Sequence, residues 1–449
     1  MKKNPSIILA IAACLTVFAD SARAYDHEVF WRNGYFRWKN FNVEQGQSSD
    51  LATAINSAIG SGNRELHILV GGKLHGQINL QPGLTLLCHD NTFEKTHGNP
   101  GFFRDGSGPL AIHDMTMWGG SGYGIRTSRA SNVTLGNLTI YDGGIGIRVD
   151  SHPSRPYEEG RWVANLTVSD CHFENNGGHG LETYGVENFQ IDNIVARNCG
   201  ECGVLVNKGR NGSVGFVDAY RCSNGGGYAG LRFANDCDDI TVSSLIAVEC
   251  GRGFFTVSDC EDITVANAYI RDCTSHAVLI QNSNRVGING GTYDGTGLNH
   301  YTSTNCWINA VPVERRRIIN RGSGRALDAA GNANGSNVII YDYSGGTNQR
   351  WDIAESGGGA FTIRSAQSGG RSLDASWSPQ NGTSVYIWDF WGGSPQIWRV
   401  SSVGDSHFKI TPDLDTSRCL DAYGTANGAD VGLWSYWGGS NQQWSIQNQ

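Results

Sequence analysis

The chain has few charged residues and no excess of positive charge. Of its 449 residues 17% are charged, and 34 Lys and Arg stand against 42 Asp and Glu, which gives a formal net charge of -8. We therefore expect no nucleic-acid partner bound through a basic face. The modest charge and the 39% of hydrophobic residues also exclude a polypeptide that stays disordered. The length suits two folded domains.

Long hydrophobic runs are scarce too. The one near the start, Ile7 to Phe18, follows two lysines and precedes Ala22-Arg23-Ala24, a small-residue pattern typical of a signal cleavage site. It is too short to span a bilayer, and no later stretch approaches 18 apolar residues. We expect residues 1–24 to be a signal peptide and the mature protein to be secreted and extracellular, without a membrane span. For its oligomeric state, a monomer is the default.

Helical periodicity is nearly absent, and short alternating strands recur after a small residue. Their spacings are 22, 34, 23, 27, 23 and 24 residues, and a second strand signal lies between them. Such coils resemble a right-handed parallel β-helix, which predicts an all-β fold over residues 25–311. An amphipathic helix from Ser48 is expected to cap the open end. The repeats are GIRTS from Gly124, GIRVD from Gly146, GLETY from Gly180, GVLVN from Gly203, GLRFA from Gly230, GFFTV from Gly253 and AVLIQ from Ala277.

The cysteines also follow a structural period. Removing the signal peptide leaves 11 of the 12, an odd number, so at least one thiol has no partner within the chain. We expect a stacked interior column; one or two disulfides, Cys237 to Cys260 or Cys199 to Cys202, are the alternative. The column members are Cys171, Cys199, Cys222, Cys250 and Cys273, at intervals of 28, 23, 28 and 23.

After Cys306 the sequence becomes rich in tryptophan, with three aligned segments. The segments repeat every 46 to 47 residues. They are RALDA at Arg325 with NQRW, RSLDA at Arg371 with PQIW, and RCLDA at Arg418 with NQQW. They resemble the ricin-type β-trefoil lectin, a carbohydrate-binding module with Q-x-W repeats, over residues 312–449. No Pro- or Gly-rich linker precedes this unit, so we expect it to pack against the β-helix.

The lectin resemblance implies a sugar pocket in each repeat, made of an Asp, an aromatic ring and an Asn-Gln pair. Pro395 takes the Asn position of the second repeat and makes that pocket the doubtful one. A trefoil retained only for packing is the alternative. The implied residues are Asp328, Tyr341, Asn348 and Gln349; Asp374, Trp388 and Gln396; and Asp421, Trp434, Asn441 and Gln442.

Alternation along the repeated strands sends the second and fourth residues after each Gly outward. We expect Arg148 to pair with Glu182, and Arg126 to have no such partner. Adjacent arginines repel unless an anion lies between them, which indicates an acidic polysaccharide. The two columns are Arg126, Arg148, Glu182, Leu205, Arg232, Phe255 and Leu279, and Ser128, Asp150, Tyr184, Asn207, Ala234, Val257 and Gln281.

A loop of about ten extra residues, from Ser151 to Trp162, leaves directly from these columns. VDSHP at Val149 resembles the D-P-H segment of mannuronan C5-epimerases, which implies Asp150 and His152 as catalytic residues. The sequence departs from that family at Ile147, Ser151 and Tyr184. GGHGLE at Gly177 is similar to a segment of polygalacturonases, which implies His179, although that family's Asp pair is missing upstream.

The groove admits two cleavage chemistries. In β-elimination on a uronate, as in pectate lyases, an arginine neutralises the carboxylate while His152 and Tyr184 serve as base and acid; epimerisation shares the first steps. In hydrolysis, Asp150 and Glu182, roughly 8 Å apart, act as an inverting pair. We favour the lyase slightly. The catalytic candidates are Asp150, His152, Glu182, Tyr184 and Arg148, and the substrate-binding candidates are Arg126, Arg232, Asn207, His179 and Trp162.

Two alternatives remain. The solenoid could be the passive stalk of a carbohydrate-binding adhesin, since β-helices host enzymes and fibres alike. No set of metal ligands is predicted, and a bound cation stays an open alternative. Ca²⁺ is the candidate ion, because Asp236, Asp238 and Asp239 are either ligands or residues of a coil turn.

Overall fold

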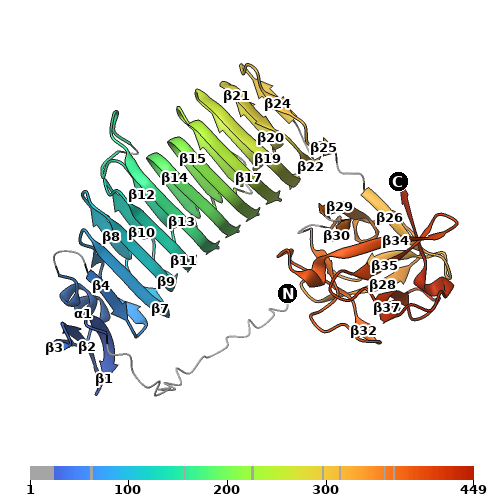
Figure 1. Ribbon diagram of the computed structural model, residues 1–449, viewed down its shortest axis with the longest axis horizontal. Helices are drawn as coiled ribbons and strands as arrows, with labels where there is room; N and C mark the ends of the chain where they lie inside the picture. Colours follow the sequence, from blue (N-terminus) through green and yellow to red (C-terminus); the bar gives the residue numbers. More distant parts are fainter. Residues whose placement is uncertain are drawn as a thin grey trace, which may run out of the picture.

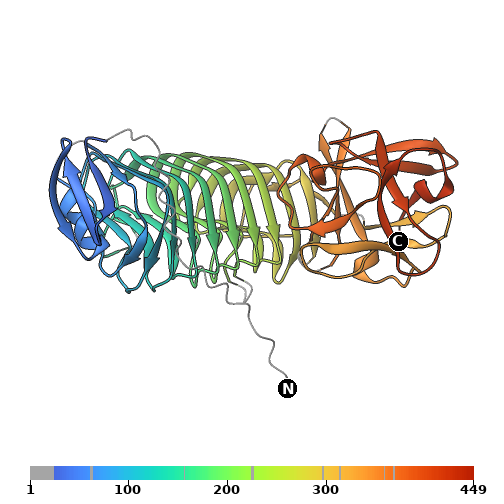
Figure 2. The same ribbon diagram turned by 90° about the horizontal axis from the view of Figure 1, so that it is seen from below.

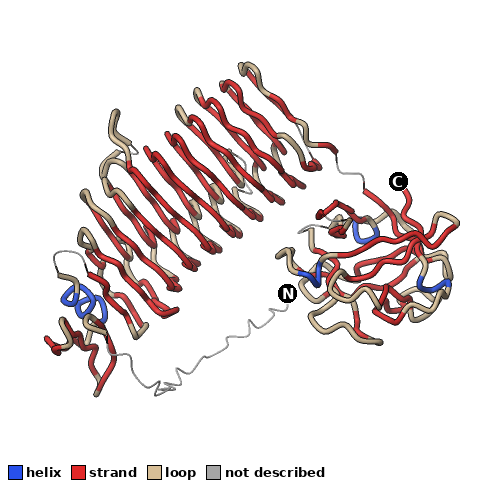
Figure 3. Tube along the Cα trace, in the orientation of Figure 1, coloured by secondary structure: helices blue, strands red, loops and turns tan. Residues whose placement is uncertain are grey.

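The computed structural model describes residues 25–60, 64–155, 157–223, 227–295, 298–312, 315–357, 359–367 and 370–448. The predicted signal peptide, residues 1–24, lies outside the described residues. Figure 1 shows a long β-solenoid followed by a compact C-terminal β-domain, and Figure 3 shows how little helix the chain contains. No helix in the described part of the chain is both long and apolar enough to cross a bilayer.

The solenoid is a parallel β-helix in which each strand pairs with the equivalent strand of the next coil. One of its faces, called here the groove sheet, consists of β8, β10, β12, β16, β18 and β20 with the first parts of β14 and β15. The solenoid strands are β4 (Arg64–Ile68), β5 (Gly72–Leu74), β6 (Ile78–Asn79), β7 (Leu84–Lys95), β8 (Phe102–Asp105), β9 (Leu110–Trp118), β10 (Tyr123–Ser128), β11 (Val133–Tyr141), β12 (Ile145–Asp150), β13 (Val163–Glu174), β14 (Leu181–Arg197), β15 (Val204–Tyr220), β16 (Leu231–Ala234), β17 (Asp238–Val248), β18 (Arg252–Val257), β19 (Cys260–Cys273), β20 (His276–Gln281), β21 (Ser283–Ile288), β22 (Gly291–Gly295), β23 (Leu298–Tyr301), β24 (Trp307–Ile308) and β25 (Val311–Pro312).

The strand register confirms the two predicted columns of the groove sheet. Arg126 pairs with Arg148, Arg148 with Glu182, and the column continues through Leu205, Arg232 and Phe255. Between these outward residues, apolar side chains such as Ile147 and Leu181 point into a core that runs the length of the solenoid. Period-two alternation therefore fixes which side chains the groove sheet presents.

The corners between strands explain the abundance of asparagine. Asn175, Asn193 and Asn198 have φ values of 53°, 51° and 51°, in the left-handed region that Asn tolerates better than most residues. Their side chains form ladders between coils: Asn198 Nδ2 donates to Asn175 Oδ1 at 3.1 Å, and Asn193 Nδ2 donates to Asp170 Oδ1 at 2.7 Å. These bonds stabilise the turns without a disulfide.

The cysteine column is confirmed for four of its five members. These four cysteines are buried, and each lies two residues after a strand position that pairs in register with its equivalent in the next coil. They are Cys199, Cys222, Cys250 and Cys273. Cys171 pairs instead with Ile194 and belongs to another column, because Glu174 pairs with Arg197 and the position equivalent to Cys199 is therefore taken by Asn176. All 11 cysteines of the described chain are free, so the alternative disulfides are not formed.

The N-terminal end of the solenoid is closed by a small antiparallel sheet and a helix. The sheet consists of β1 (Glu28–Arg32), β2 (Tyr35–Asn40) and β3 (Val43–Ser48), and α1 (Leu51–Ala58) follows it. Asp50 caps α1 by accepting a hydrogen bond from the Thr53 N–H at 2.8 Å. The buried face of α1 covers core residues that the first coil leaves open, which confirms the predicted cap (Figure 1).

The C-terminal domain is a β-trefoil with three repeats around one core. Trp351, Trp398 and Trp444 are fully buried, and each Nε1 donates to the carbonyl of a leucine in its own repeat, at 2.9, 2.9 and 3.1 Å. Its elements are β26 (Arg315–Asn320), β27 (Ala326–Ala329), β28 (Ser336–Tyr341), η1 (Thr347–Gln349), β29 (Trp351–Gly357), β30 (Ala360–Ser365), β31 (Ser372–Asp374), β32 (Thr383–Ser384), β33 (Tyr386–Trp388), η2 (Ser394–Gln396), β34 (Trp398–Gly404), β35 (His407–Pro412), β36 (Arg418–Ala422), β37 (Ala429–Ser435), η3 (Ser440–Gln442) and β38 (Trp444–Asn448).

The two domains contact each other through buried polar groups. The Arg271 guanidinium of the solenoid is fully buried where the domains meet and lies 2.6 Å from the Asp352 carboxylate of the trefoil. Arg364 of the trefoil stacks on Tyr269 of the solenoid with its Cζ 4.6 Å from the ring centroid. The trefoil is thus packed against the side of the β-helix, as the missing linker predicts (Figures 1 and 2).

Candidate functional site

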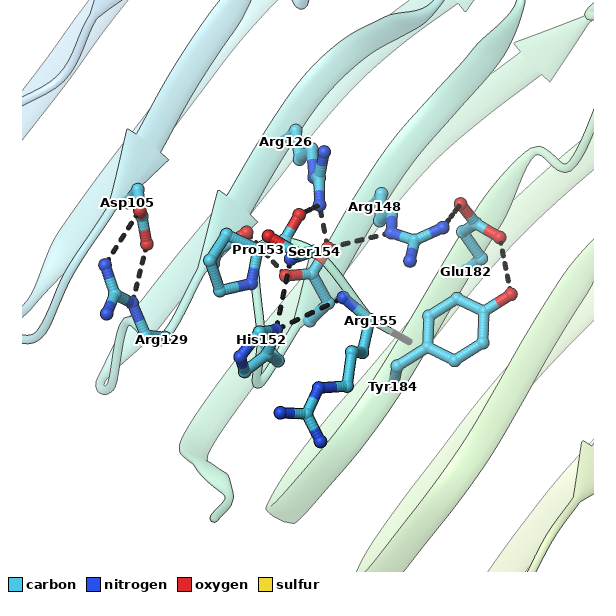
Figure 4. A network of polar contacts seen from close by, with 12 residues as sticks. Asp105, Arg126, Arg129, Arg148, His152, Pro153, Ser154, Arg155, Glu182 and Tyr184 are labelled. Carbon is cyan, nitrogen blue, oxygen red and sulfur yellow. Dashed lines mark hydrogen bonds and ion pairs between the residues drawn. The ribbon is translucent and has the colours of Figure 1, made fainter. Parts of the chain in front are cut away.

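The centre of the groove sheet is an ionic network around Asp150. Arg126 Nε and Arg148 Nε lie 3.1 and 2.8 Å from Asp150 Oδ2, and Ser128 Oγ donates to Oδ1 at 2.5 Å (Figure 4). Asp150 has no exposed surface. The expectation that Arg126 has no carboxylate partner is therefore wrong: the anion between the two arginines is Asp150 itself. A carboxylate with three donors and no exposure is built to position arginines and does not face a substrate.

His152 is occupied in its own loop. Its Nδ1 accepts hydrogen bonds from the backbone N–H groups of Ser154 and Arg155, at 3.1 and 3.2 Å, which turns the chain after the groove strand (Figure 4). The loop is then tied to the groove because Arg126 Nη2 donates to the Pro153 carbonyl at 2.6 Å. The structure thus brings His152 near the arginines but gives its Nδ1 a structural role.

Glu182 is paired with Arg148, as predicted, at 3.1 Å between Oε1 and Nη1. Its other oxygen accepts a hydrogen bond from the Tyr184 hydroxyl at 3.0 Å. Burial raises the pKa of Glu182, and burial together with the neighbouring carboxylate raises the pKa of Tyr184 well above its usual range. Tyr184 therefore stays protonated at neutral pH and is a proton donor.

His179 lies beside Glu182 and connects it to Glu201. Its Nδ1 accepts a hydrogen bond from the Cys202 N–H at 3.0 Å, so the proton of the neutral ring is on Nε2. That Nε2 lies 2.9 Å from Glu201 Oε2 and 3.4 Å from Glu182 Oε2. Burial, followed by the charge of Arg232, lowers the pKa of His179 to about 3. His179 is thus a neutral donor, and Glu201 is its acceptor.

Glu201 is the site residue that sequence reasoning missed. Its side chain is 34% exposed, against 2% for Glu182, so it is the accessible carboxylate of this cluster. It also acts on Tyr228, whose pKa it raises by disfavouring the phenolate. The available signal was its place two residues before Gly203, one position away from the equivalent of His179, which stands one residue before Gly180 in the preceding coil.

Two further arginines lie one to two coils beyond this cluster. Arg232 Cζ and Arg252 Cζ stand 4.9 and 4.5 Å from the centroid of the Phe255 ring. Among the described residues, neither guanidinium has a carboxylate within ion-pair distance, and Arg232 Nε and Arg252 Nε and Nη1 are buried without a hydrogen-bond partner. Burial and the charge of Arg232 lower the pKa of Arg252. The pair is suited to binding an anion between its guanidinium groups.

The remaining substrate-binding candidates lie at the edge of the groove or away from it. Asn207 follows Tyr184 in register, is nearly buried and accepts a hydrogen bond from Asn235 at 3.1 Å. Trp162 is not in the groove sheet, because the guanidinium of Arg210, on the neighbouring face, stacks on its ring at 4.0 Å. The loop thus carries Trp162 away from the groove sheet, and the spacing of the repeats does not reveal this path.

No group of three or more metal-ligating side chains is placed to hold a metal ion in the described part of the chain. Asp236, one of the acids considered for Ca²⁺, lies 3.4 Å from the Lys208 ammonium. It has a left-handed φ of 54°, as has Asp239 with 52°, which places both at coil turns.

Comparison with known families identifies both domains. Residues 123–315 match the model of the right handed beta helix region, and residues 314–444 match that of the ricin-type beta-trefoil lectin domain. The chain is a right-handed β-helix with a ricin-type lectin domain. The ricin-type lectin domain points to carbohydrate binding by the C-terminal part of the chain.

Several solved structures are similar to the lectin domain. The designed three-fold symmetric protein ThreeFoil is 35% identical over 30% of this chain and 99% of its own, with a TM-score of 0.29. The Macrolepiota procera ricin B-like lectin, solved with lactose, is 29% identical over 30% and 96%, with a TM-score of 0.27. An exo-beta-1,3-galactanase from Clostridium thermocellum is 27% identical over 30% and 30%, with a TM-score of 0.29. No curated protein matches the chain.

The first and third lectin pockets have the geometry that the resemblance implies. Asn348 Nδ2 donates to Asp328 Oδ1 at 2.8 Å, and Asn441 Nδ2 donates to Asp421 Oδ1 at 2.7 Å. The aromatic residues Tyr341 and Trp434 are 45% and 42% exposed, as a stacking platform requires. Gln442 also donates to Asp421, at 2.9 Å, whereas Gln349 donates to the carbonyl of Asp342.

The second lectin pocket differs. Pro395 provides no amide donor, and Asp374 instead accepts a hydrogen bond from the Ser376 N–H at 2.9 Å. Gln396 is fully buried and donates to the Asp389 carbonyl at 3.0 Å, so it supports the turn. Trp388 keeps its exposed ring, but the Asp–Asn pair of the other two repeats is lost.

Proposed function

We propose that this protein is an exported enzyme that cleaves an anionic polysaccharide on the groove sheet, while its lectin domain binds the same or an adjoining glycan. The observation that supports cleavage is the cluster of Glu201, His179 and Tyr184 next to the unpaired Arg232 and Arg252. It offers an accessible carboxylate base, a neutral donor, a protonated hydroxyl and two cations within four successive coils. A passive stalk has no need of buried ionisable groups arranged in this way.

The proposed reaction is β-elimination on a uronate. Arg232 and Arg252 hold the sugar carboxylate and withdraw charge from it, which makes the adjacent carbon-bound proton more acidic. Glu201 takes that proton. The carbon–oxygen bond to the leaving sugar then breaks, a double bond forms in the ring, and the Tyr184 hydroxyl protonates the leaving oxygen. The His179 N–H, fixed by Cys202, orients the Glu201 carboxylate.

This assignment replaces two earlier candidates. Asp150 holds Arg126 and Arg148 in place, and the Nδ1 of His152 holds its own loop, so both are positioning residues in the proposed mechanism. Arg148 in turn orients Glu182 at 3.1 Å. The proposed base is therefore Glu201 in place of His152. Arg232 and Arg252 are the proposed clamp, that is, the arginines that hold the sugar carboxylate, in place of Arg126 and Arg148.

Hydrolysis is the second candidate, and one observation favours it. Glu182 and Glu201 both approach the Nε2 of His179, yet burial raises the pKa of Glu182 while Glu201 is partly exposed. Two carboxyl groups in unlike environments are the usual acid and base of a glycosidase. Against this, both oxygens of Glu182 already accept hydrogen bonds, from Arg148 and Tyr184, so neither is free to contact a leaving oxygen.

The test is incubation of the purified protein with a panel of polyuronates and neutral polysaccharides. Ultraviolet absorbance of unsaturated uronate and release of reducing ends are followed together. Elimination predicts that both signals rise in parallel on a polyuronate and on no neutral polymer. Reducing ends without absorbance would support hydrolysis, and no signal on any polymer would contradict cleavage and leave the protein a binding module.

A further inference from the structure

A cavity of about 890 Å³ lies between the two domains and apart from the groove sheet. Its solenoid wall consists of outward residues on β13, β17 and the later parts of β14 and β15, so it faces away from Glu201 and Arg232. Its other wall is the second lectin repeat, at Arg371 and at 388–392. This volume falls within the range of ligand-binding pockets. We call this space the interdomain cleft.

Aromatic side chains from both domains line the interdomain cleft. Trp388 and Trp391 come from the lectin domain, with exposures of 42% and 47%, and Phe216 comes from β15. Trp377 supports Trp391, with 5.2 Å between the ring centroids. Flat rings of this kind bind the apolar faces of sugars. The cleft shares Trp388 with the second pocket that the lectin resemblance implies, but Asp374, the acid of that pocket, is not among its lining residues.

The arginines of the cleft are all paired with carboxylates. Arg197 pairs with Asp218 at 2.5 Å, and Arg371 pairs with Asp389 at 3.1 Å. Arg221 pairs with Glu249 at 2.8 Å. Each arginine in the lining thus has a carboxylate partner, in contrast to Arg232 and Arg252 in the groove. Such a surface offers hydrogen bonds to hydroxyl groups but no spare positive charge for an anion.

The contacts between the domains keep the two walls of the cleft together. Arg364 is nearly buried between Tyr269 and Phe390, with its Cζ 4.6 and 4.4 Å from the two ring centroids. The buried pair of Arg271 and Asp352 lies beside it. A pocket built on such a fixed interface needs little ordering when a ligand enters, which favours affinity.

We propose that the interdomain cleft binds a neutral oligosaccharide that stacks on Trp391 and Phe216, as a site shared by the β-helix and the lectin domain. This inference does not rest on the cleavage proposed for the groove sheet. It assigns the second lectin repeat a sugar site that the β-helix completes, in place of the Asp–Asn pair that the repeat lacks.

The test uses the full-length protein with the first and third lectin pockets removed by Asp328→Asn and Asp421→Asn. Neutral hexasaccharides of glucose, galactose and xylose are titrated by calorimetry, and folding of each variant is checked by its melting temperature. We expect one hexasaccharide to bind, with an affinity that salt does not change because the ligand is uncharged. Phe216→Ala and Trp391→Ala should each weaken it at least about fivefold, which is the scale of one lost aromatic contact.

Trp437→Ala is the matched control, since Trp437 is the equivalent of Trp391 in the third repeat and is 65% exposed. It should leave the affinity within about twofold. Binding that survives Phe216→Ala unchanged would overturn the shared site and return the ligand to the lectin domain alone. Absence of binding by all three hexasaccharides would also overturn it. Neither result bears on cleavage, which is measured on polyuronates and depends on Glu201 and Arg232.

Discussion

The Nε2 of His179 lies 2.9 Å from the Oε2 of Glu201, while the other ring nitrogen of His179 accepts the backbone N–H of Cys202. The ring can therefore only donate to Glu201, whose side chain is 34% exposed. Because the two residues come from successive coils, the parallel register of the β-helix fixes this geometry. The proposed base is thus oriented by a residue that takes no part in proton transfer.

Removal of the proposed clamp should lower activity on polyuronates and its dependence on salt. Arg232→Ala removes a charged hydrogen bond to the sugar carboxylate, so kcat/KM is expected to fall by about tenfold to a hundredfold. Arg210→Ala is the control, because Arg210 lies on the neighbouring face and is paired with Glu187 at 2.6 Å. Initial rates at low and high salt measure both effects. Equal rates for the two variants would refute the clamp.

Replacement of Asp150 should affect stability first. Asp150→Asn leaves Arg126 and Arg148 without a buried counter-charge, and a loss of about 3 kcal/mol or more in the free energy of unfolding is expected. Asp105→Asn breaks the exposed pair with Arg129, at 2.7 Å, and should cost less than about 1 kcal/mol. Denaturant unfolding compares them. An Asp150→Asn protein of unchanged stability but without activity would restore Asp150 as a catalytic residue.

The buried His179 should make the protein less stable in acid. Its pKa is about 3 in the folded protein, against about 6.5 when unfolded, so the unfolded chain binds the extra proton between these values. Stability is therefore lost as the pH falls from 6.5 toward 3. His179→Gln keeps hydrogen-bonding groups but removes the titration, and should flatten this part of the curve of melting temperature against pH. Parallel curves for the two proteins would show that His179 does not titrate as described.

The lectin pockets should act on binding and not on the chemical step. Asp328→Asn with Asp421→Asn is expected to weaken adsorption to an insoluble polysaccharide, while turnover of a short soluble fragment stays the same, because the pockets only raise local substrate concentration. Asp374→Asn should change neither, since its pocket lacks the Asn partner. Pull-down and initial-rate assays measure the two properties. Loss of turnover in the double variant would show that the lectin domain contributes to the active site.

Regular alternation made much of the groove predictable. Gly-x-x-x-x spacing gave the in-register columns of Arg148, Glu182 and Tyr184, and the QxW repeats gave the Asp–Asn contacts of two lectin pockets. The columns follow from short-range periodicity, which the sequence displays directly, whereas the lectin contacts follow from the resemblance to the ricin-type lectin.

Residues at turns could not be placed in the same way. Glu201 lies before its strand, where period-two alternation does not hold, and Trp162 ends an irregular loop that carries it to Arg210 on the neighbouring face. The sequence also does not tell that the loop after Asp150 folds back so that the Pro153 carbonyl binds Arg126, which helps to bury Asp150. These contacts depend on the path of an irregular loop, and that path is set by tertiary packing.

The central claim is tested most directly by comparing the wild-type protein with Glu201→Gln on one polyuronate, with absorbance and reducing ends recorded in the same reaction. The account predicts that the wild type raises both signals in parallel, and that Glu201→Gln lowers both by about a hundredfold or more while it still binds the polymer. Glu187→Gln, which alters an exposed glutamate paired with Arg210, should match the wild type. Undiminished cleavage by Glu201→Gln, or reducing ends without absorbance, would contradict the account.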